Sequence, residues 1–373
     1  MIELRMPSFG ADMDAAQLVK WLVQPGQVLK RGDVVAVVET QKGAIDVELW
    51  QDGTMARLVA QPGQDIPVGE TLAVLAGEGE DWQVLAAQPA PASATPSGPQ
   101  RALASPAARQ RAEALGVDLQ ALADKAGNRA ITLADVEQAA ARKSPDDSAP
   151  SHGDAMRSAI GAAMARSWRE IPHYHVGCEI VVEKALQALE NFNRDRPVNE
   201  RVLFAAVLMR AVAQAVMETP SLNGRFENGR FQPASAVHLG VVTSLRGGGL
   251  VVPTVHDAHR LSLTELMAAL QSVLLRARSR QLRSSDLTDS TLSVSQMGDL
   301  GAESVQGVIY PSQVALVGLG SVAMRPAVVD GQVVAARTLQ ASLAGDHRVS
   351  DGLVGSRFLA ALGARLTDPK VLQ

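Results

Sequence analysis

The first eighty residues contain an internal repeat, which constrains the fold more than any other feature of the sequence. The stretch LVQPGQVLKRGDVVAVV at 22–38 returns as LVAQPGQDIPVGETLAVL at 58–75, and the QPGQ motif recurs after 37 residues. Each copy has a Pro-Gly turn, then a Gly-acid turn, then a β-branched strand. Two similar β units in so short a stretch predict an all-β domain, a flattened barrel or sandwich with pseudo-twofold symmetry.

One lysine, Lys42, lies between the two copies of the repeat. The residues around it alternate between apolar and polar as strands do, with Val35 and Val37 before it and Ile45 after it. Gly43 permits a tight turn, so the pattern predicts a β-hairpin with Lys42 at its tip. The chain has seven lysines and twenty-eight arginines, so lysine is the rarer basic residue and its presence at this position is informative. An ordinary exposed turn lysine is the alternative.

This region resembles the lipoyl domain of 2-oxo acid dehydrogenase complexes. Three segments within residues 2–77 carry the resemblance: MPSFGADMDAAQLVKWLVQPGQVLKRGD, VVETQKGAIDVE and DGTMARLVAQPGQDIPVGE. The resemblance implies that Lys42 carries covalently bound lipoate. In the related biotinyl domain the modified lysine lies between methionines, whereas its neighbours here are Gln41 and Gly43, which favours lipoate. Gln41 is a mild departure from the residues that lipoyl domains usually have at that position.

Two stretches of biased composition divide the rest of the chain. Residues 78–102 include the uncharged run AAQPAPASATPSGPQ, and residues 141–155 read ARKSPDDSAPSHGDA. Neither can bury enough apolar surface to fold by itself. Both are therefore predicted to be linkers, and the prolines make the first one semi-extended.

Residues 103–140, between the two linkers, are predicted to form a small helical module. SPAARQRAEALGVDL and ITLADVEQA resemble the peripheral subunit-binding domain of the same complexes, although most glycines of that family's central loop are missing. The resemblance implies that the module binds the decarboxylase or the dihydrolipoyl dehydrogenase subunit. Arg109 and Arg111 would then be its electrostatic contacts, because exposed arginines pair well with carboxylates. A helical spacer without a partner is the alternative.

Residues 156–373 alternate between helical and strand patterns, which predicts an α/β layered domain with a mixed sheet. The longest apolar run, 202–217, is too short and too interrupted to span a bilayer, so a buried helix is expected. The expected helices are 156–168, 185–193, 202–218, 262–280 and 353–366, and the expected strands are 173–182, 238–244, 250–255, 291–295, 313–322 and 332–343.

The clearest candidate catalytic motif is the segment GDHRVSDG at 345–352. His347 precedes Asp351 by four residues, where the last predicted helix begins. An ordinary loop histidine and a helix cap are the alternatives for this pair. A second segment, DSTLSVSQMG at 289–298, alternates as a strand and puts hydroxyls, Ser295 among them, on one face. Hydroxyls at a reactive site can donate hydrogen bonds to a developing oxyanion.

These segments resemble the catalytic domain of dihydrolipoamide acyltransferases and, more distantly, chloramphenicol acetyltransferase. The resemblance covers 156–373 and includes MRSAIGAAMARSWREIPHYH, PSLNGRF, HLGVVTSLRGGGLVVPTVHDA, VIYPSQVALVGLG and DHRVSDGLVGSRFLAAL. By matching position it implies His347 as general base, Asp351 as its supporting acid and Ser295 as the oxyanion-stabilising hydroxyl. Gln296 and Ser312 depart from the family's usual Asn and Pro but remove no catalytic group.

The combined resemblance implies the acyltransferase core subunit of a 2-oxo acid dehydrogenase complex. It would transfer an acyl group, acetyl first among the candidates, from dihydrolipoyl-Lys42 to coenzyme A in a pyruvate or acetoin complex. The family forms trimers that build a hollow core, with the active site between subunits. A branched-chain complex and a non-catalytic lipoyl-bearing scaffold are the alternatives. The core size, 24 or 60 subunits or another number, and the partner of 103–140 stay open.

Composition excludes several other classes of protein. The net charge is −4, with no basic excess for nucleic acid or an anionic membrane. The single cysteine, Cys178, excludes an intrachain disulfide framework and a Cys-based zinc site, and the remaining histidines have no metal-ligand spacing. No signal-peptide pattern begins the sequence, so a cytoplasmic protein is expected.

Overall fold

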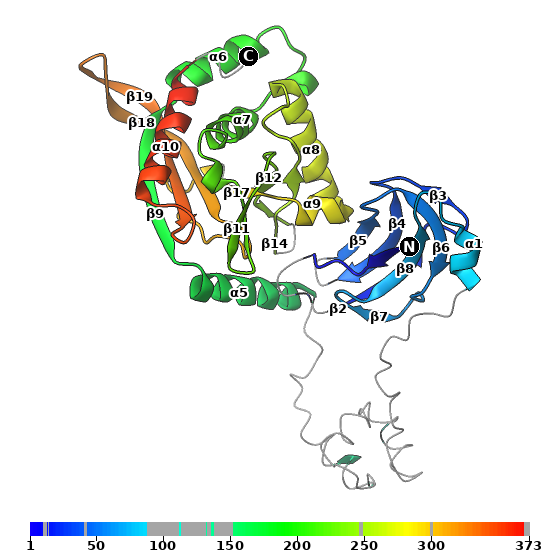
Figure 1. Ribbon diagram of the computed structural model, residues 1–373. Helices are drawn as coiled ribbons and strands as arrows, with labels where there is room; N and C mark the ends of the chain where they lie inside the picture. Colours follow the sequence, from blue (N-terminus) through cyan, green and yellow to red (C-terminus); the bar gives the residue numbers. More distant parts are fainter. Residues whose placement is uncertain are drawn as a thin grey trace. The chain divides into compact units, whose positions relative to one another are not determined.

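The computed structural model describes residues 1–9, 13, 15–40, 43–87, 112, 132, 136–137, 152–245, 249–298 and 301–368. Residues 1–86 and 156–373 form one compact unit, with an N-terminal β domain and a C-terminal α/β domain (Figure 1). Most of the helical module predicted for 103–140, including Arg109 and Arg111, lies outside the described residues. Two helices extend into the predicted linkers: α1 (Trp82–Ala87) and the first turn of α5 (His152–Glu170).

The β domain consists of two sheets, as the repeat predicts. One has the strand order β1-β8-β6-β3, and the other has the order β5-β4-β2-β7, with one strand from the α/β domain paired to the outer edge of β5. The strands are β1 (Ile2–Arg5), β2 (Ala15–Trp21), β3 (Val28–Leu29), β4 (Val34–Thr40), β5 (Gly43–Glu48), β6 (Gly53–Leu58), β7 (Asp65–Pro67) and β8 (Thr71–Ala76).

The two copies of the repeat form equivalent turns. Gly26 and Gly63 have φ of 88° and 86°, a left-handed conformation that glycine adopts without steric cost. In the first copy the backbone N–H of Gln24 donates to the Gln27 side chain at 3.2 Å, and Gln61 and Gln64 repeat this bond at 3.1 Å. The repeated sequence therefore specifies the same local hydrogen bonds twice.

The predicted hairpin joins β4 to β5. Their antiparallel pairing continues to Thr40 and Gly43, and Gly43 has a φ of 106°, which suits glycine alone. Gln41 and Lys42 connect these last paired residues in the sequence but lie outside the described residues. The structure therefore confirms the hairpin that frames Lys42.

The α/β domain is built on a mixed six-stranded sheet with the order β15-β12-β17-β18-β19-β9. The pairs β12–β17 and β17–β18 are parallel, and the remaining pairs are antiparallel. Its strands are β9 (His173–Val181), β12 (Leu239–Val241), β15 (Thr254–Val255), β17 (Leu292–Gln296), β18 (Ala315–Val329) and β19 (Gln332–Asp346); smaller pairings involve β10 (Gly224–Glu227), β11 (Arg230–Pro233), β13 (Thr243–Ser244), β14 (Leu250–Val251) and β16 (Leu282–Arg283). The helices that follow α5 are α6 (Glu183–Asn193), α7 (Phe204–Val216), α8 (Leu263–Ser279), α9 (Ser284–Thr288) and α10 (Gly352–Thr367), with short 3₁₀ turns at Val198–Glu200 and Pro220–Leu222.

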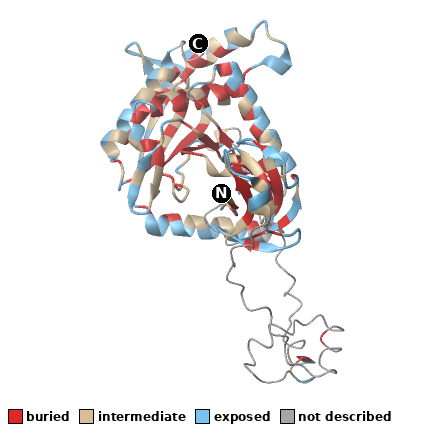
Figure 2. Ribbon diagram, turned by 45° about the vertical axis from the view of Figure 1, so that its right-hand side comes forward, coloured by how far each residue is buried: buried red, intermediate tan, exposed pale blue. Residues whose placement is uncertain are grey.

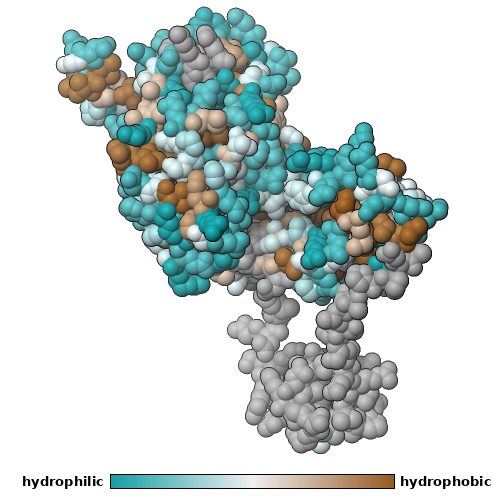
Figure 3. All heavy atoms as spheres, in the orientation of Figure 1, coloured by the Kyte–Doolittle hydropathy of each residue, from teal (hydrophilic) through white to brown (hydrophobic). Residues whose placement is uncertain are grey.

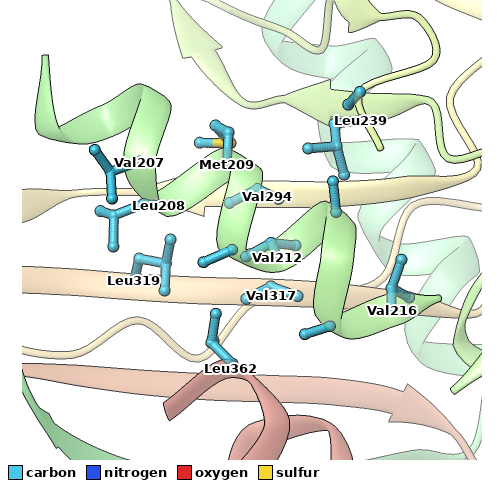
Figure 4. Packing of buried hydrophobic residues seen from close by; sticks show 14 of the residues in the cluster. Val207, Leu208, Met209, Val212, Val216, Leu239, Val294, Val317, Leu319 and Leu362 are labelled. Carbon is cyan, nitrogen blue, oxygen red and sulfur yellow. The ribbon is translucent and has the colours of Figure 1, made fainter. Parts of the chain in front are cut away.

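Helix α7 lies at the centre of the α/β core. It covers the apolar run expected to be a buried helix, and nine of its thirteen residues are buried. Figure 4 shows Val212 and Met209 facing Val294 and Val317 of the sheet, with Leu362 of α10 nearby. The buried residues in Figure 2 concentrate in this layer and inside the β domain. In the part of the chain that the structure describes, no helix is long and apolar enough to cross a membrane.

Strands β18 and β19 extend beyond the sheet as a two-stranded arm. The strand expected at 313–322 continues to Val329 and turns at Asp330 and Gly331, which both have positive φ. The arm exposes large apolar side chains: Met324, Val328 and Val333 are 64%, 70% and 76% accessible, and brown atoms lie on part of this projection in Figure 3. Exposed apolar surface of this extent commonly marks an interaction site.

Candidate active site

His347 lies in the turn that joins β19 to α10, and an ion pair with a buried carboxylate fixes this turn. Asp346 is fully buried, and its carboxylate accepts hydrogen bonds from the Arg348 side chain at 2.7, 3.0 and 3.1 Å. The Arg348 guanidinium also stacks on the Phe226 ring, 3.9 Å from its centroid. A planar guanidinium suits this arrangement because it binds a carboxylate and an aromatic face together. The backbone on both sides of His347 is therefore held in place.

The imidazole of His347 is exposed and contacts the ring of Tyr174. The Tyr174 and His347 rings lie edge to face, with centroids 5.2 Å apart. Tyr174 shares a hydrogen bond of 2.9 Å with Ser350, on the same turn. Burial raises the pKa of the Tyr174 phenol, so it stays protonated at neutral pH. The backbone N–H of His347 donates to Pro172 at 2.9 Å, which ties the turn to the start of β9.

Asp351 caps helix α10. Its carboxylate accepts hydrogen bonds from the backbone N–H groups of Leu353 and Val354, both at 3.0 Å. This is the usual role of aspartate at a helix N-terminus. Asp351 therefore fixes where α10 begins, four residues after His347.

Ser295 lies on β17, between β12 and β18, and is 9% accessible. The strand has the predicted alternation, because Leu292 and Val294 belong to the apolar core. The opposite face is polar but also largely buried. There, Ser293 donates to Gln313 at 2.7 Å, and the Gln313 amide donates to Ser290 at 2.7 Å.

Ser295 and His347 are far apart within one chain. Ser295 pairs with Gly318 on the neighbouring strand β18, and Gly318 pairs with Ser342 on β19. Two strand spacings of about 4.8 Å separate these positions, and His347 follows Ser342 by five residues, about 16 Å along a strand at ~3.3 Å per residue. The sheet therefore does not bring the two side chains together in a single copy.

His173 is a structural histidine beside this site. Its Nδ1 is 2.8 Å from the carbonyl oxygen of Ile171, and its Nε2 accepts from the Ile309 backbone N–H at 3.1 Å. These bonds define a neutral ring with the proton on Nδ1. Burial lowers the pKa of His173, which agrees with this state.

Sequence reasoning singled out His347, Asp351 and Ser295 as candidates but missed the residues that hold the turn around His347. Asp346 and Arg348 flank His347 in the quoted segment, yet nothing in the sequence indicated that they form an ion pair. Phe226 and Tyr174 come from distant segments. The signal that could have pointed to Tyr174 is Gly345, where an added Cβ would lie 2.3 Å from the Tyr174 ring.

Comparison with known proteins agrees with the division into an N-terminal and a C-terminal domain. The profile of the 2-oxoacid dehydrogenases acyltransferase (catalytic domain) family matches residues 147–373. A second profile, described as biotin-requiring enzyme, matches residues 2–75.

Individual relatives span the chain or its C-terminal part. The dihydrolipoyllysine-residue acetyltransferase component of the pyruvate dehydrogenase complex from Rickettsia bellii is 25% identical, and the alignment covers 100% of this chain and 98% of the relative. A probable dihydrolipoamide acetyltransferase from Listeria monocytogenes is 25% identical with a TM-score of 0.54, over 60% of this chain and 94% of that structure. A truncated catalytic core of the 2-oxoacid dehydrogenase multienzyme complex from Thermoplasma acidophilum is 26% identical with a TM-score of 0.52, over 57% of this chain and 95% of that structure.

The folds confirm the predicted architecture, a lipoyl-type β domain followed by an α/β acyltransferase domain. The catalytic-domain profile covers more than half of the chain. The chain therefore belongs to the family of dihydrolipoamide acyltransferases that form the core of 2-oxoacid dehydrogenase complexes.

Proposed function

We propose that this chain transfers an acetyl group between a dihydrolipoyl group on Lys42 and coenzyme A. The observation that carries this proposal is the exposed His347 ring on a turn that the ion pair of the buried Asp346 carboxylate with Arg348 fixes. The relative from Rickettsia bellii, which matches along the whole chain, is named as an acetyltransferase of the pyruvate dehydrogenase complex. That name supports acetyl as the transferred group.

The β domain fits a lipoyl attachment site. The paired strands end at Thr40 and Gly43, so Gln41 and Lys42 are the link between them, and only a lysine offers an amine there for an amide bond. Lipoate bound to Lys42 would supply a swinging dithiol that carries the acyl group as a thioester. The rigid hairpin restricts where that arm begins.

His347 would act as the general base. A free thiol has a pKa near 8.5 and is mostly protonated at neutral pH. A neutral imidazole accepts the proton of the coenzyme A thiol while the coenzyme A sulfur attacks the thioester carbonyl. A new carbon–sulfur bond to coenzyme A forms, the bond to the dihydrolipoyl sulfur breaks, and the imidazolium returns its proton to the leaving sulfur. Tyr174 limits how the ring can turn.

Ser295 would donate a hydrogen bond to the carbonyl oxygen as negative charge builds on it. Within one copy Ser295 and His347 lie far apart, which supports a site shared by two copies in a trimer. The apolar arm formed by β18 and β19 supports association as well, since 64–76% accessible apolar side chains are costly to leave in water. Asp351 would assist His347 indirectly, by fixing the start of α10.

We also propose which subunits of the complex this chain binds. Residues 103–140 would bind the decarboxylase or the dihydrolipoyl dehydrogenase subunit, and Arg109 and Arg111 would contact carboxylates on that partner. An acetoin or branched-chain complex is the second candidate, because the matched catalytic-domain family, the 2-oxoacid dehydrogenases acyltransferases, is not restricted by its description to one 2-oxo acid. A non-catalytic scaffold is disfavoured because His347, Asp351 and Ser295 are all present.

The acyl preference can be measured directly. We expect turnover of acetyl-CoA with dihydrolipoamide to exceed that of isobutyryl-CoA and succinyl-CoA in kcat/KM. A pocket for a small acyl group gains at most about 10- to 200-fold discrimination per methylene. A higher kcat/KM for isobutyryl-CoA would instead assign the chain to a branched-chain complex.

Replacing either proposed catalytic side chain should slow acyl transfer. His347→Ala removes the general base, and we expect kcat to fall by about 100- to 10,000-fold. Ser295→Ala removes one oxyanion donor, and we expect a loss of about 100- to 1,000-fold. The assay is acetyl transfer from acetyl-CoA to dihydrolipoamide. Ser244→Ala, a change of an exposed serine on β13, serves as the matched control. Unchanged turnover in His347→Ala would rule out this mechanism.

Two substitutions distinguish the helix-capping role of Asp351 from any role of its negative charge. Asparagine caps a helix as well as aspartate does, whereas alanine costs about 0.5–2 kcal/mol. We therefore expect Asp351→Asn to keep both its melting temperature and its pH profile of kcat/KM, and Asp351→Ala to lower the melting temperature and the turnover. If Asp351→Asn lost as much turnover as Asp351→Ala, the carboxylate charge itself would be required.

Lipoylation of Lys42 is testable by intact-mass measurement. After expression with lipoate, the chain should gain one lipoyl increment, and this increment should be absent in Lys42→Arg, which retains the positive charge. Lys20→Arg, on strand β2 of the same domain, is the control and should keep the increment. Persistence of the increment in Lys42→Arg would place the modification elsewhere.

A further inference from the structure

The β domain and the α/β domain share a β-sheet. Strand β16 pairs in parallel with β5, with Leu282 level with Ile45 and Arg283 level with Asp46. Without β16, β5 would be the edge of its sheet. An exposed edge strand offers unpaired backbone groups to any strand that can add to it. Figure 1 shows β5 beside α9, the helix that directly follows β16.

A buried carboxylate at the end of β5 reinforces this pairing. Glu48 is 5% accessible, and its carboxylate accepts hydrogen bonds from the Ser285 hydroxyl at 2.5 Å and the Ser285 backbone N–H at 3.2 Å. The Ser284 hydroxyl lies 3.5 Å from the same oxygen, and the Arg283 guanidinium lies 3.7 Å from the other one. All of these partners belong to the α/β domain. A carboxylate taken out of water needs such partners, because burial without them is costly.

The segment that receives β5 is itself held firmly. Asp286 is 1% accessible and binds the Arg276 guanidinium through two hydrogen bonds of 2.6 and 2.9 Å. The same carboxylate accepts from the Arg283 backbone N–H at 3.0 Å. Leu287 packs against the apolar core of the β domain, and Leu282 packs against Ala277 of α8. Residues 282–287 thus offer the β domain a strand edge, two hydroxyl groups and an apolar contact. The bonds of Asp286 and the packing of Leu282 hold these residues in place within the α/β domain.

We propose that residues 282–287 are a docking site for the β5 edge of the chain's own lipoyl-type domain. The site recognises a free strand edge that ends in a carboxylate, here Glu48. The proposal rests on the proposed function, because it gives the domain that carries Lys42 a resting place on the catalytic domain. Gly43, the first residue of β5, lies beside Arg280, since a Cβ at Gly43 would be 3.7 Å from the Arg280 Cβ.

Docking at this site would act through effective concentration. A tethered domain meets its own α/β domain far more often than free domains would meet at the same protein concentration. Two paired residues and one buried carboxylate form a small contact, which allows release for visits to other active sites. The contact would therefore bias the carrier toward the acyltransferase without fixing it there.

Disulfide trapping in the full chain tests the docking. Asp46→Cys with Arg283→Cys, in a Cys178→Ser background, places two thiols on paired residues, within the Cα separation that a disulfide needs. The control pair is Asp46→Cys with Arg230→Cys, on the β10–β11 hairpin. We expect the docked pair to form an intrachain disulfide roughly tenfold faster than the control pair. Equal rates, measured by peptide mapping after alkylation, would overturn the proposal.

The contribution of Glu48 is tested in the same trapping variant. We expect Glu48→Gln to slow disulfide formation by roughly 10- to 100-fold, because a charged acceptor of three hydrogen bonds is lost. Glu78→Gln, an exposed glutamate of the same domain, should leave the rate unchanged. Equal rates in the two variants would show that the carboxylate does not recognise the site.

Failure of this proposal can be separated from failure of the proposed function. Turnover of free dihydrolipoamide by the wild-type chain requires no docking of the β domain. If that turnover is present and trapping fails, the docking site is wrong and the acyltransferase assignment stands. If trapping succeeds and turnover is absent, the docking stands and the proposed activity is wrong. Turnover of the reduced cysteine variants shows that their α/β domains are folded.

Discussion

The long antiparallel pairing of β18 with β19 is the interaction on which the α/β domain depends. At one end this pair carries the turn with His347, and at the other it leaves the sheet as the apolar arm. β17 pairs along one side and β9 along the other, so the strands of Ser295 and Tyr174 take their register from the same ladder. A one-residue slip would invert every side chain on the shifted strand. The register of one hairpin therefore determines the positions of the candidate catalytic groups.

Packing on one face of the sheet secures that register. Helix α7 lies against β17 and β18 through residues such as Val212, Val294 and Val317, all fully buried. Helix α10, which begins at the Asp351 cap, packs against α7 through Leu362. The turn with His347 is thus held between a strand and a helix that both belong to the core. Rigid elements on both sides suit a general base, because proton transfer requires a fixed distance to the reacting group.

The sequence predicted the features that depend on local patterns. The repeat implied two equivalent turns, and these occur at Gly26 and Gly63. The apolar run at 202–217 became α7. The candidate site depends on contacts between residues far apart in the sequence, and local patterns do not predict such contacts. Phe226 stacks on Arg348 from more than a hundred residues away in the sequence, and β16 is a two-residue strand that pairs with β5 without a recognisable periodicity. The separation of Ser295 from His347 follows from strand order, which composition and spacing do not determine.

Tyr174 occupies a notch between two glycines, Gly345 at the end of β19 and Gly355 in α10. A Cβ at Gly345 would lie 2.3 Å from the ring, and one at Gly355 would lie 3.0 Å from it. The thickness of a single aromatic ring therefore sets how closely the first turn of α10 approaches the sheet. A larger side chain at either glycine would displace the ring and change the gap, while a smaller residue at 174 would leave the gap unfilled. These three positions should consequently change together, if at all, as acyltransferases of this kind diverge.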